Sequence, residues 1–305
     1  MIAEPNVKPS TFYGYTTATE KRLIPKFGFM KVKNLTPKIV SAYYNELLKE
    51  GLTEEYIQYI HSILKMAAKT AIDWKYIKND FMSAVKPPTR KKKSVETWSI
   101  DECNKFLSRM REQKDHIFLL YYLAIYTGMR RGELLGLRWG DIDLDKKRFY
   151  IKHSLYYISG KGLVLQTPKT SSGTRNISIT DDVILELKSY KLKKQQQLLQ
   201  VGQKLSDEHF VISAFGGEPV NPNTIHKQFL YDIKLAGVKR IRFHDLRHTH
   251  ATIMLEIGES SKVVSERLGH SNVSMTLDKY SHVTSNLQDT SAENFSKALR
   301  KSTSE

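Results

Sequence analysis

Apolar residues recur every three or four positions through much of the first 85 residues, which is the spacing of one face of an α-helix. Two runs show this spacing most clearly. Their apolar positions are Ile39, Val40, Tyr43 and Leu47 in the first run, and Ile57, Ile60, Leu64, Ala67 and Ile72 in the second. Thr36 followed by Pro37 is typical of a helix start, as is Thr53 followed by two glutamates. The pattern predicts a small all-helical domain over residues 1–85.

The pattern changes over residues 86–98, where the sequence reads KPPTRKKKSVETW. Two prolines disfavour a helix, and they precede a basic run made of Arg90, Lys91, Lys92 and Lys93. The simplest interpretation is a solvated interdomain linker. If DNA-binding domains flank it, the same run would cross a phosphate backbone and make binding depend on salt. We interpret the segment as the linker and leave both readings of its charge open.

Residues 99–305 combine helical spacing with short segments that resemble strands. Ser99 followed three positions later by Glu102 predicts a capped helix start. The strand-like segments are residues 148–157, 163–167 and 175–179, and helical spacing covers residues 116–126, 181–200 and 222–237. We therefore expect a mainly α fold with a small antiparallel β-sheet, an α+β architecture, in a chain of two domains.

Composition adds a strong positive charge to this picture. Lys and Arg number 48 against 32 Asp and Glu, which gives a net charge of +16. Such an excess favours a polyanionic partner. The single cysteine, Cys103, rules out an internal disulfide and a cysteine-rich metal site. Because there is neither an apolar run near the ~18 residues that span a bilayer nor a signal peptide, we expect a cytoplasmic protein with no membrane partner.

The most informative chemistry lies between residues 243 and 283. His244 and Arg247 are three positions apart, so they share one face of a helix, and His270 and Tyr280 follow. Arginine binds phosphate oxygens through a planar fork, histidine exchanges a proton near neutral pH, and tyrosine offers an oxygen nucleophile. Each residue alone is weak evidence, because surface tyrosines and His-x-x-Arg pairs are common. Together they suit chemistry on a phosphodiester.

The order and spacing of these residues resemble a known family. HDLRHTHA, LGHSN and TLDKYSHV follow one another, beginning at His244, Leu268 and Thr276. The set resembles the second conserved box of the tyrosine recombinases, the family of phage and transposon integrases. TGMRRGELLGLRWG, beginning at Thr127, resembles the family's first box, in which the arginine after Thr-Gly-x binds the scissile phosphate. By this register Arg130 is that arginine, and Arg131 is expected to meet the DNA backbone or an acidic neighbour.

A third segment resembles the family's β-hairpin, whose lysine enters the active site and protonates the leaving 5′ oxygen. TPKT places Lys169 at the base of a turn, ahead of a basic strand-like segment. Lys161 is the competing candidate. The catalytic residues implied by the resemblance are thus Arg130, Lys169, His244, Arg247, His270 and Tyr280.

The resemblance implies a reaction through a 3′-phosphotyrosyl intermediate. Arg130 and Arg247 would hold the non-bridging oxygens while Tyr280 attacks, with His244 accepting its proton and His270 hydrogen-bonding the phosphate. Because arginines supply the positive charge, and no cluster with metal-ligand spacing is present in the sequence, we expect neither a metal nor another cofactor. ATP is not required, since the phosphotyrosyl bond keeps the energy of the original link.

The resemblance also implies an organisation and partners. Residues 1–85 would be the core-type DNA-binding domain and residues 99–305 the catalytic domain, which together form a clamp around double-stranded DNA. A tail helix over residues 291–299 would act within its own subunit or on a neighbour, in a homotetramer on synapsed DNA. An excisionase or a host DNA-bending protein are candidate further partners. Longer integrases carry an N-terminal arm-binding domain, and the sequence leaves open whether one was removed.

The function we expect is site-specific recombination for the integration or excision of a mobile element in a bacterial host. A chromosome-dimer resolvase and a type IB topoisomerase share the catalytic residues and stay as alternatives. A DNA-binding regulator without catalysis is the alternative outside the enzymes. The presence of the complete candidate set argues against a protein that has lost its catalysis.

Overall fold

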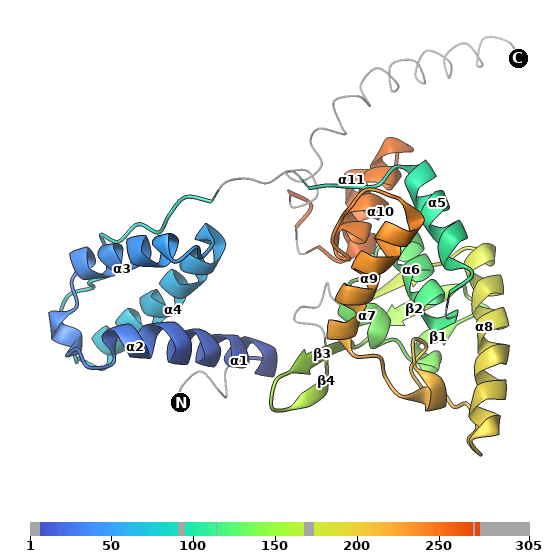
Figure 1. The fold of residues 1–305 in the computed structure, drawn as a ribbon, viewed down its shortest axis with the longest axis horizontal. Coiled ribbons are helices and arrows are strands. Elements are labelled where there is room, and N and C mark those ends of the chain that lie inside the picture. Colours follow the sequence, from blue (N-terminus) through green and yellow to red (C-terminus); the bar gives the residue numbers. More distant parts are fainter. Residues whose placement is uncertain (1–6, 91–94, 114, 168–173, 271, 275–305) are drawn as a thin grey trace, which may run out of the picture. The chain divides into compact units, whose positions relative to one another are not determined.

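The computed structural model describes residues 7–90, 95–113, 115–167, 174–270 and 272–274 (Figure 1). The chain divides into two compact units, residues 1–94 and residues 95–305. Each unit has its own hydrophobic core, so each is described by itself. In the described part of the chain, no helix is both long enough and apolar enough to cross a membrane.

The first unit is all-helical, as its spacing predicts. Helix α1 (Pro9–Ala18) continues through a π-helical turn (Thr19–Leu23) into α2 (Ile24–Phe27), and α3 (Pro37–Lys49) and α4 (Glu54–Asp73) follow. The predicted caps are present. The hydroxyl of Thr36 accepts a hydrogen bond from the amide of Ile39, and that of Thr53 accepts one from the amide of Tyr56. The apolar faces of α3 and α4 contribute Val40, Leu47, Ile57 and Ile60 to the core.

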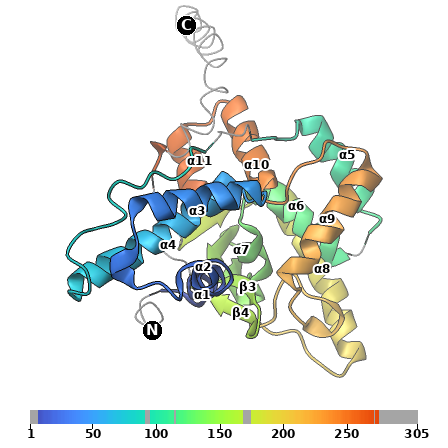
Figure 2. The same ribbon diagram turned by 60° about the vertical axis from the view of Figure 1, so that its left-hand side comes forward.

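The second unit is built around α6 (Asp115–Thr127), which is buried along almost its entire length. Its sequence is apolar on all sides, and such a helix is stable in water only when others cover it. Four helices pack on it: α5 (Ile100–Met110), α7 (Arg131–Leu135), α8 (Asp181–Gln200) and α10 (Asp245–Glu256). Helix α10 also packs against α11 (Ser261–Leu268), and α9 (Pro222–Ala236) packs on α5 (Figure 2).

The strands of the second unit form two small antiparallel sheets. One has the order β1 (Ile142–Asp143), β2 (Arg148–Ile151), β5 (Arg175–Ser178), and the other is the hairpin of β3 (Ser154–Ile158) and β4 (Gly162–Gln166). The mainly α prediction is confirmed. However, the single segment expected over residues 148–157 is wrong, because the chain leaves β2 after Ile151 and β3 pairs with a different partner.

Candidate active site

A turn between α6 and α7 places Arg130 beside the C-terminal end of α11. Gly128 has φ = 64°, a value that favours glycine. A Cβ atom there would lie 2.7 Å from the Cδ2 atoms of both His250 and Leu268, so a larger residue would force α10 or α11 to move. The hydroxyl of Thr127 secures the turn by accepting a hydrogen bond from the amide of Met129 (3.3 Å). Close packing against α10 and α11 therefore requires glycine at position 128.

Arg130 is held on one side and open on the other. Its Nη1 donates to Oε1 of Glu133 (2.8 Å), its backbone amide donates to Oε2 (2.9 Å), and its Nη2 donates to the carbonyl oxygen of Gly269 (3.1 Å). Glu133 is only 4% exposed, whereas the Arg130 side chain is 40% exposed. The guanidinium is therefore fixed in direction while part of it still reaches solvent.

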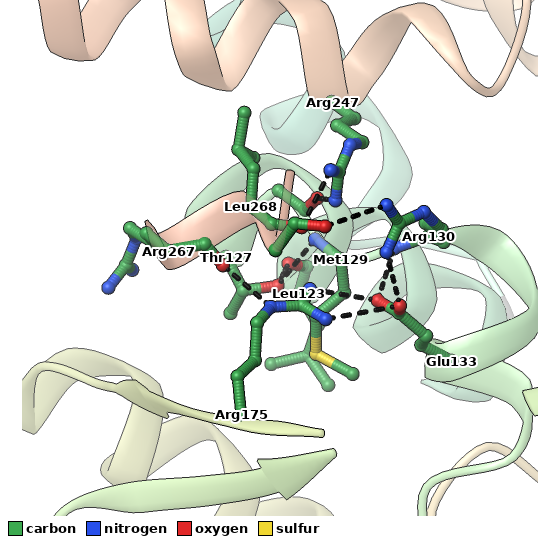
Figure 3. Close-up of polar contacts among 11 residues, drawn as sticks. Leu123, Thr127, Met129, Arg130, Glu133, Arg175, Arg247, Arg267 and Leu268 are labelled. Carbon is green, nitrogen blue, oxygen red and sulfur yellow. Dashed lines mark hydrogen bonds and ion pairs between the residues drawn. The ribbon is translucent and has the colours of Figure 1, made fainter. Parts of the chain in front are cut away.

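Arg247 lies beside Arg130, and backbone carbonyl oxygens likewise fix its guanidinium. It is buried on α10, and it donates to the carbonyl oxygens of Gly128 (Nη1, 3.0 Å) and Leu268 (Nη2, 2.6 Å). Leu268 and Gly269 are consecutive residues at the end of α11, where helix carbonyls have no partner within the helix. Both arginines thus bind adjacent peptide groups at a helix C-terminus, where positive charge is favourable (Figure 3). The structure brings these two predicted residues together.

One further arginine, Arg175, binds the carboxylate of Glu133. Arg175 on β5 binds Glu133 through Nη1 to Oε1 (3.1 Å) and Nη2 to Oε2 (2.9 Å), and its Nε donates to the carbonyl oxygen of Arg267 (2.8 Å). Burial alone would raise the pKa of Glu133, but Arg175 and Arg130 lower that pKa to about 2. The cluster therefore holds one carboxylate among several guanidiniums, and its excess positive charge favours an anion.

Arg267 extends the cluster to a buried histidine. Its Nε donates to Nε2 of His250 (3.0 Å), and its two Nη atoms donate to the carbonyl oxygens of Ser178 and Tyr126. Nδ1 of His250 lies 2.8 Å from the carbonyl oxygen of Ile125, an acceptor, so Nδ1 carries the proton and the ring is neutral. Burial and the charge of Arg267 lower the pKa of His250 to about 4, which agrees with a neutral ring.

The two predicted site histidines lie at the edges of the arginine cluster. His244 is exposed at the N-cap of α10, where Asp245 accepts hydrogen bonds from the backbone and side chain of Arg242. Its ring centroid is 5.2 Å from that of His248. His270 is partly exposed and directly follows Gly269, and its amide donates to the carbonyl oxygen of Ser265 (3.0 Å). Both histidines are therefore reachable from solvent.

A cleft of about 420 Å³ opens beside Arg130 and His244. Its lining includes Arg130, Arg131, Tyr156, Asn223, Arg242 and His244. Arg131 is partly buried there, and burial lowers the pKa of its guanidinium. The cleft is basic and has aromatic and amide groups on its walls, which suits a polyanion that also presents flat rings.

Several predicted residues are elsewhere or outside the described chain. Lys169, Tyr280 and the run Lys91–Lys93 lie outside the described residues, as does the tail segment 291–299. Arg90 is exposed in the first unit and pairs with Glu55 (3.4 Å). Lys161, the competing lysine, is exposed in the turn of the β3–β4 hairpin. Within the described ranges, no three His, Cys, Asp or Glu side chains gather in a way that could hold a metal ion.

Sequence reasoning missed the roles of Glu133, Arg175, Arg267 and His250 in this cluster. Only Glu133 had a local signal, because it lies three positions after Arg130 at the start of a helix. Arg175 is 42 residues from Glu133, and Arg267 is 89 residues from Ser178, so no sequence spacing indicates those contacts.

Comparison with protein families decides the assignment of the chain. The profile of the phage integrase family matches residues 98–286, and that of a phage integrase N-terminal SAM-like domain matches residues 3–48. The chain belongs to the phage integrase family. The recognition of a tyrosine recombinase from its two boxes is confirmed, and the chain is a tyrosine-type site-specific recombinase.

Individual relatives agree with this membership. A XerC-like tyrosine recombinase of Caldanaerobacter subterraneus subsp. tengcongensis is 30% identical, over 90% of this chain and 75% of the relative. The ICEBs1 integrase of Bacillus subtilis is 27% identical, over 94% of this chain and 77% of the relative. These relatives are similar to this recombinase over most of its length.

Solved structures share its fold. The Tn1549 transposon integrase, solved in complex with transposon right end DNA, has a TM-score of 0.79 at 22% identity and 95% coverage of both chains. A lambda integrase dimer bound to a COC′ core site has a TM-score of 0.67 at 21% identity, with 92% of this chain and 91% of that chain covered. The mainly helical architecture predicted from the sequence is therefore that of the integrases.

The buried neutral His250 gives a testable pH dependence of stability. Its pKa is about 4 in the folded protein, below the ordinary 6.5, so the unfolded chain binds the extra proton first as the pH falls. Stability from this residue is complete above pH 6.5 and is lost as the pH falls towards 4. Between pH 7 and pH 5 the loss should be about 2 kcal/mol.

His250→Gln keeps a donor and an acceptor without the titration, so its free energy of unfolding should fall by about 2 kcal/mol less than that of the wild type over this range. Urea unfolding at a series of pH values measures the difference. His226→Gln, at an exposed position on α9, is the control and should follow the wild type. An unchanged pH slope in His250→Gln would show that the ring is not buried in its neutral form.

Proposed function

We propose that this recombinase cuts and rejoins double-stranded DNA through a 3′-phosphotyrosyl intermediate, in the integration or excision of a mobile element. The observation that carries the proposal is the pair formed by Arg130 and Arg247. Their guanidiniums are fixed on the adjacent carbonyl groups of Leu268 and Gly269, in a cluster with excess positive charge. Two such forks side by side suit the two non-bridging oxygens of one phosphodiester.

In the proposed reaction the oxygen of Tyr280 attacks the scissile phosphorus and gives its proton to His244. The bond between phosphorus and the 5′ oxygen breaks, and Lys169 protonates that oxygen as it leaves. The products are a 3′-phosphotyrosyl enzyme and a free 5′ hydroxyl. Attack by the 5′ hydroxyl of another strand reverses these steps, so rejoining needs no external energy.

The arginine pair would supply electrostatic stabilisation throughout this reaction. Charge on the non-bridging oxygens increases as the phosphorus becomes five-coordinate, and donors fixed before the reaction need no reorganisation. His270 directly follows Gly269, whose carbonyl binds Arg130, which supports a role for its ring in hydrogen-bonding the same phosphate. General acid and base groups each contribute about 10²- to 10⁴-fold, so the loss of His244 or Lys169 should leave a slow enzyme.

Double-stranded DNA is the proposed partner, and a homotetramer on two synapsed duplexes is the proposed assembly. In support, the Tn1549 integrase was solved with transposon DNA and a lambda integrase tetramer was solved on a Holliday junction.

Residues 1–85 would bind core DNA, residues 86–98 would link the domains and residues 99–305 would hold the catalytic site. Arg90 to Lys93 and Arg131 are proposed contacts to the backbone. An excisionase or a host DNA-bending protein would act on this complex, in the bacterial cytoplasm.

The nucleophile is tested by trapping the covalent intermediate. A duplex selected by this protein from a random pool is nicked beside the site, so that the cleaved strand diffuses away and the adduct accumulates. The wild type should give an adduct resistant to SDS at low salt without divalent metal, and Tyr280→Phe should bind equally well but give none.

Tyr231→Phe, at an exposed tyrosine of α9, is the matched control and should react like the wild type. An adduct in Tyr280→Phe would exclude this nucleophile. Tight binding by the wild type without any adduct would favour a DNA-binding regulator over an enzyme.

The general acid is tested with a leaving group that needs no proton. Replacing the bridging 5′ oxygen by sulfur gives a better leaving group, so loss of the acid should matter less. Lys169→Ala should be slowed about 10²-fold or more on the oxygen substrate and should recover most of that loss on the sulfur substrate. Lys161→Ala is the paired variant and should be unaffected on both, whereas recovery in Lys161→Ala instead would exchange the assignments.

A further inference from the structure

Arg175 has no part in the reaction described above, yet its side chain is almost fully enclosed beside the pair formed by Arg130 and Arg247. It lies on β5, its side chain is 7% exposed, and it binds Glu133 with both Nη atoms. A buried guanidinium at this depth is costly unless it is fully paired. Its place in the structure therefore needs a reason beyond general stability.

Arg175 completes the hydrogen bonds that the carboxylate of Glu133 can accept. A carboxylate offers about four lone-pair sites. Oε1 accepts from Nη1 of Arg130 and Nη1 of Arg175, while Oε2 accepts from the amide of Arg130 and Nη2 of Arg175. Arg175 thus takes up half of the accepting capacity. The Arg130 side chain is left with a single bond to the carboxylate, although a two-bond fork would otherwise be open to it.

This arrangement has an electrostatic consequence for Arg130. If Glu133 were free to take a second bond from the Arg130 guanidinium, the two charges would cancel in a bidentate pair and the guanidinium would turn away from the site. With Arg175 in place, the negative charge of Glu133 is matched by a different cation. The three groups together then carry one net positive charge, and Arg130 keeps a fixed direction with part of its guanidinium open to the phosphate.

Arg175 is itself held by an independent contact. Its Nε donates to the carbonyl oxygen of Arg267, whose guanidinium is bound by Ser178, Tyr126 and neutral His250. These contacts join β5 to the end of α6 and to α11. Arg175 is therefore set by the framework of the unit, and its orientation does not depend on Glu133 alone.

We propose that Arg175 is a positioning residue of the active site, which occupies Glu133 so that Arg130 stays oriented and charged towards the scissile phosphate. The inference rests on the proposed function, because it requires Arg130 to bind that phosphate. Groups that orient metal ligands in a comparably indirect way change activity by about 10- to 100-fold, and we expect an effect of the same order here. The loss should appear in the rate of the covalent step, because Arg175 is buried away from the surface that would meet DNA.

The test is a double-mutant cycle on the rate of adduct formation, with saturating protein on the nicked duplex. Arg175→Met should slow the adduct by about 10- to 100-fold, with DNA affinity within about threefold of the wild type. In the Arg130→Ala background the same change should cost less than about threefold, because Arg175 acts only through Arg130. Arg148→Met, at an exposed arginine of the neighbouring strand β2, should match the wild type.

Arg175→Lys guards against a variant that does not fold, because it keeps the charge and one hydrogen bond but loses the fork. It should fall between wild type and Arg175→Met, and its defect should also disappear in the Arg130→Ala background. Equal factors in the two backgrounds, or wild-type rates in both variants, would overturn the inference while leaving the recombinase proposal intact. If the wild type itself forms no Tyr280-dependent adduct, the proposed function fails and the inference falls with it.

Discussion

A single buried carboxylate with its four hydrogen bonds sets the geometry of the arginine cluster in the second unit. Glu133 accepts from the backbone and side chain of Arg130 and from the fork of Arg175, which joins the start of α7 to strand β5. Arg267 continues the connection to α6 and α11. Because each arginine is also bound by a backbone carbonyl, the guanidiniums stay apart instead of collapsing on the one negative charge. The remaining positive charge is what this cluster would offer to the proposed phosphate.

The C-terminal end of α11 provides the second set of contacts that fix the arginines. Arg130 and Arg247 bind the carbonyls of Gly269 and Leu268, which α11 leaves without partners where it ends. Gly269 has φ = 68° and ends that helix, while Gly128, also at positive φ, lets the turn before Arg130 approach α10 and α11 closely. Gly128 and Gly269 are therefore both needed for the positions of Arg130 and Arg247. A larger residue at position 128 would displace α10 or α11, and with them the groups that hold the two arginines.

The helical elements and their starts could be predicted because their signals are local. Thr36, Thr53 and Ser99 cap the helices that follow them, as their positions indicate, and α6 is buried because its sequence has no polar face. The division of residues 148–157 between two sheets could not be predicted, since strand pairing depends on partners distant in sequence.

The family boxes identified Arg130 and Arg247, which lie together. They gave no indication of Arg175 or Arg267, whose contacts join segments far apart in the chain. Lys169 and Tyr280 stay predictions from the sequence.

The most direct test of phosphate binding by Arg130 and Arg247 is a structure of the Tyr280→Phe variant bound to an uncleaved duplex that contains its selected site. We expect one non-bridging oxygen of the scissile phosphate within about 3 Å of the Arg130 guanidinium and the other equally close to Arg247. We also expect Glu133 to keep its contacts to Arg130 and Arg175 in that complex. A scissile phosphate bound away from these two guanidiniums, or an Arg130 that leaves Glu133 to reach it, would contradict the proposed role of the two arginines.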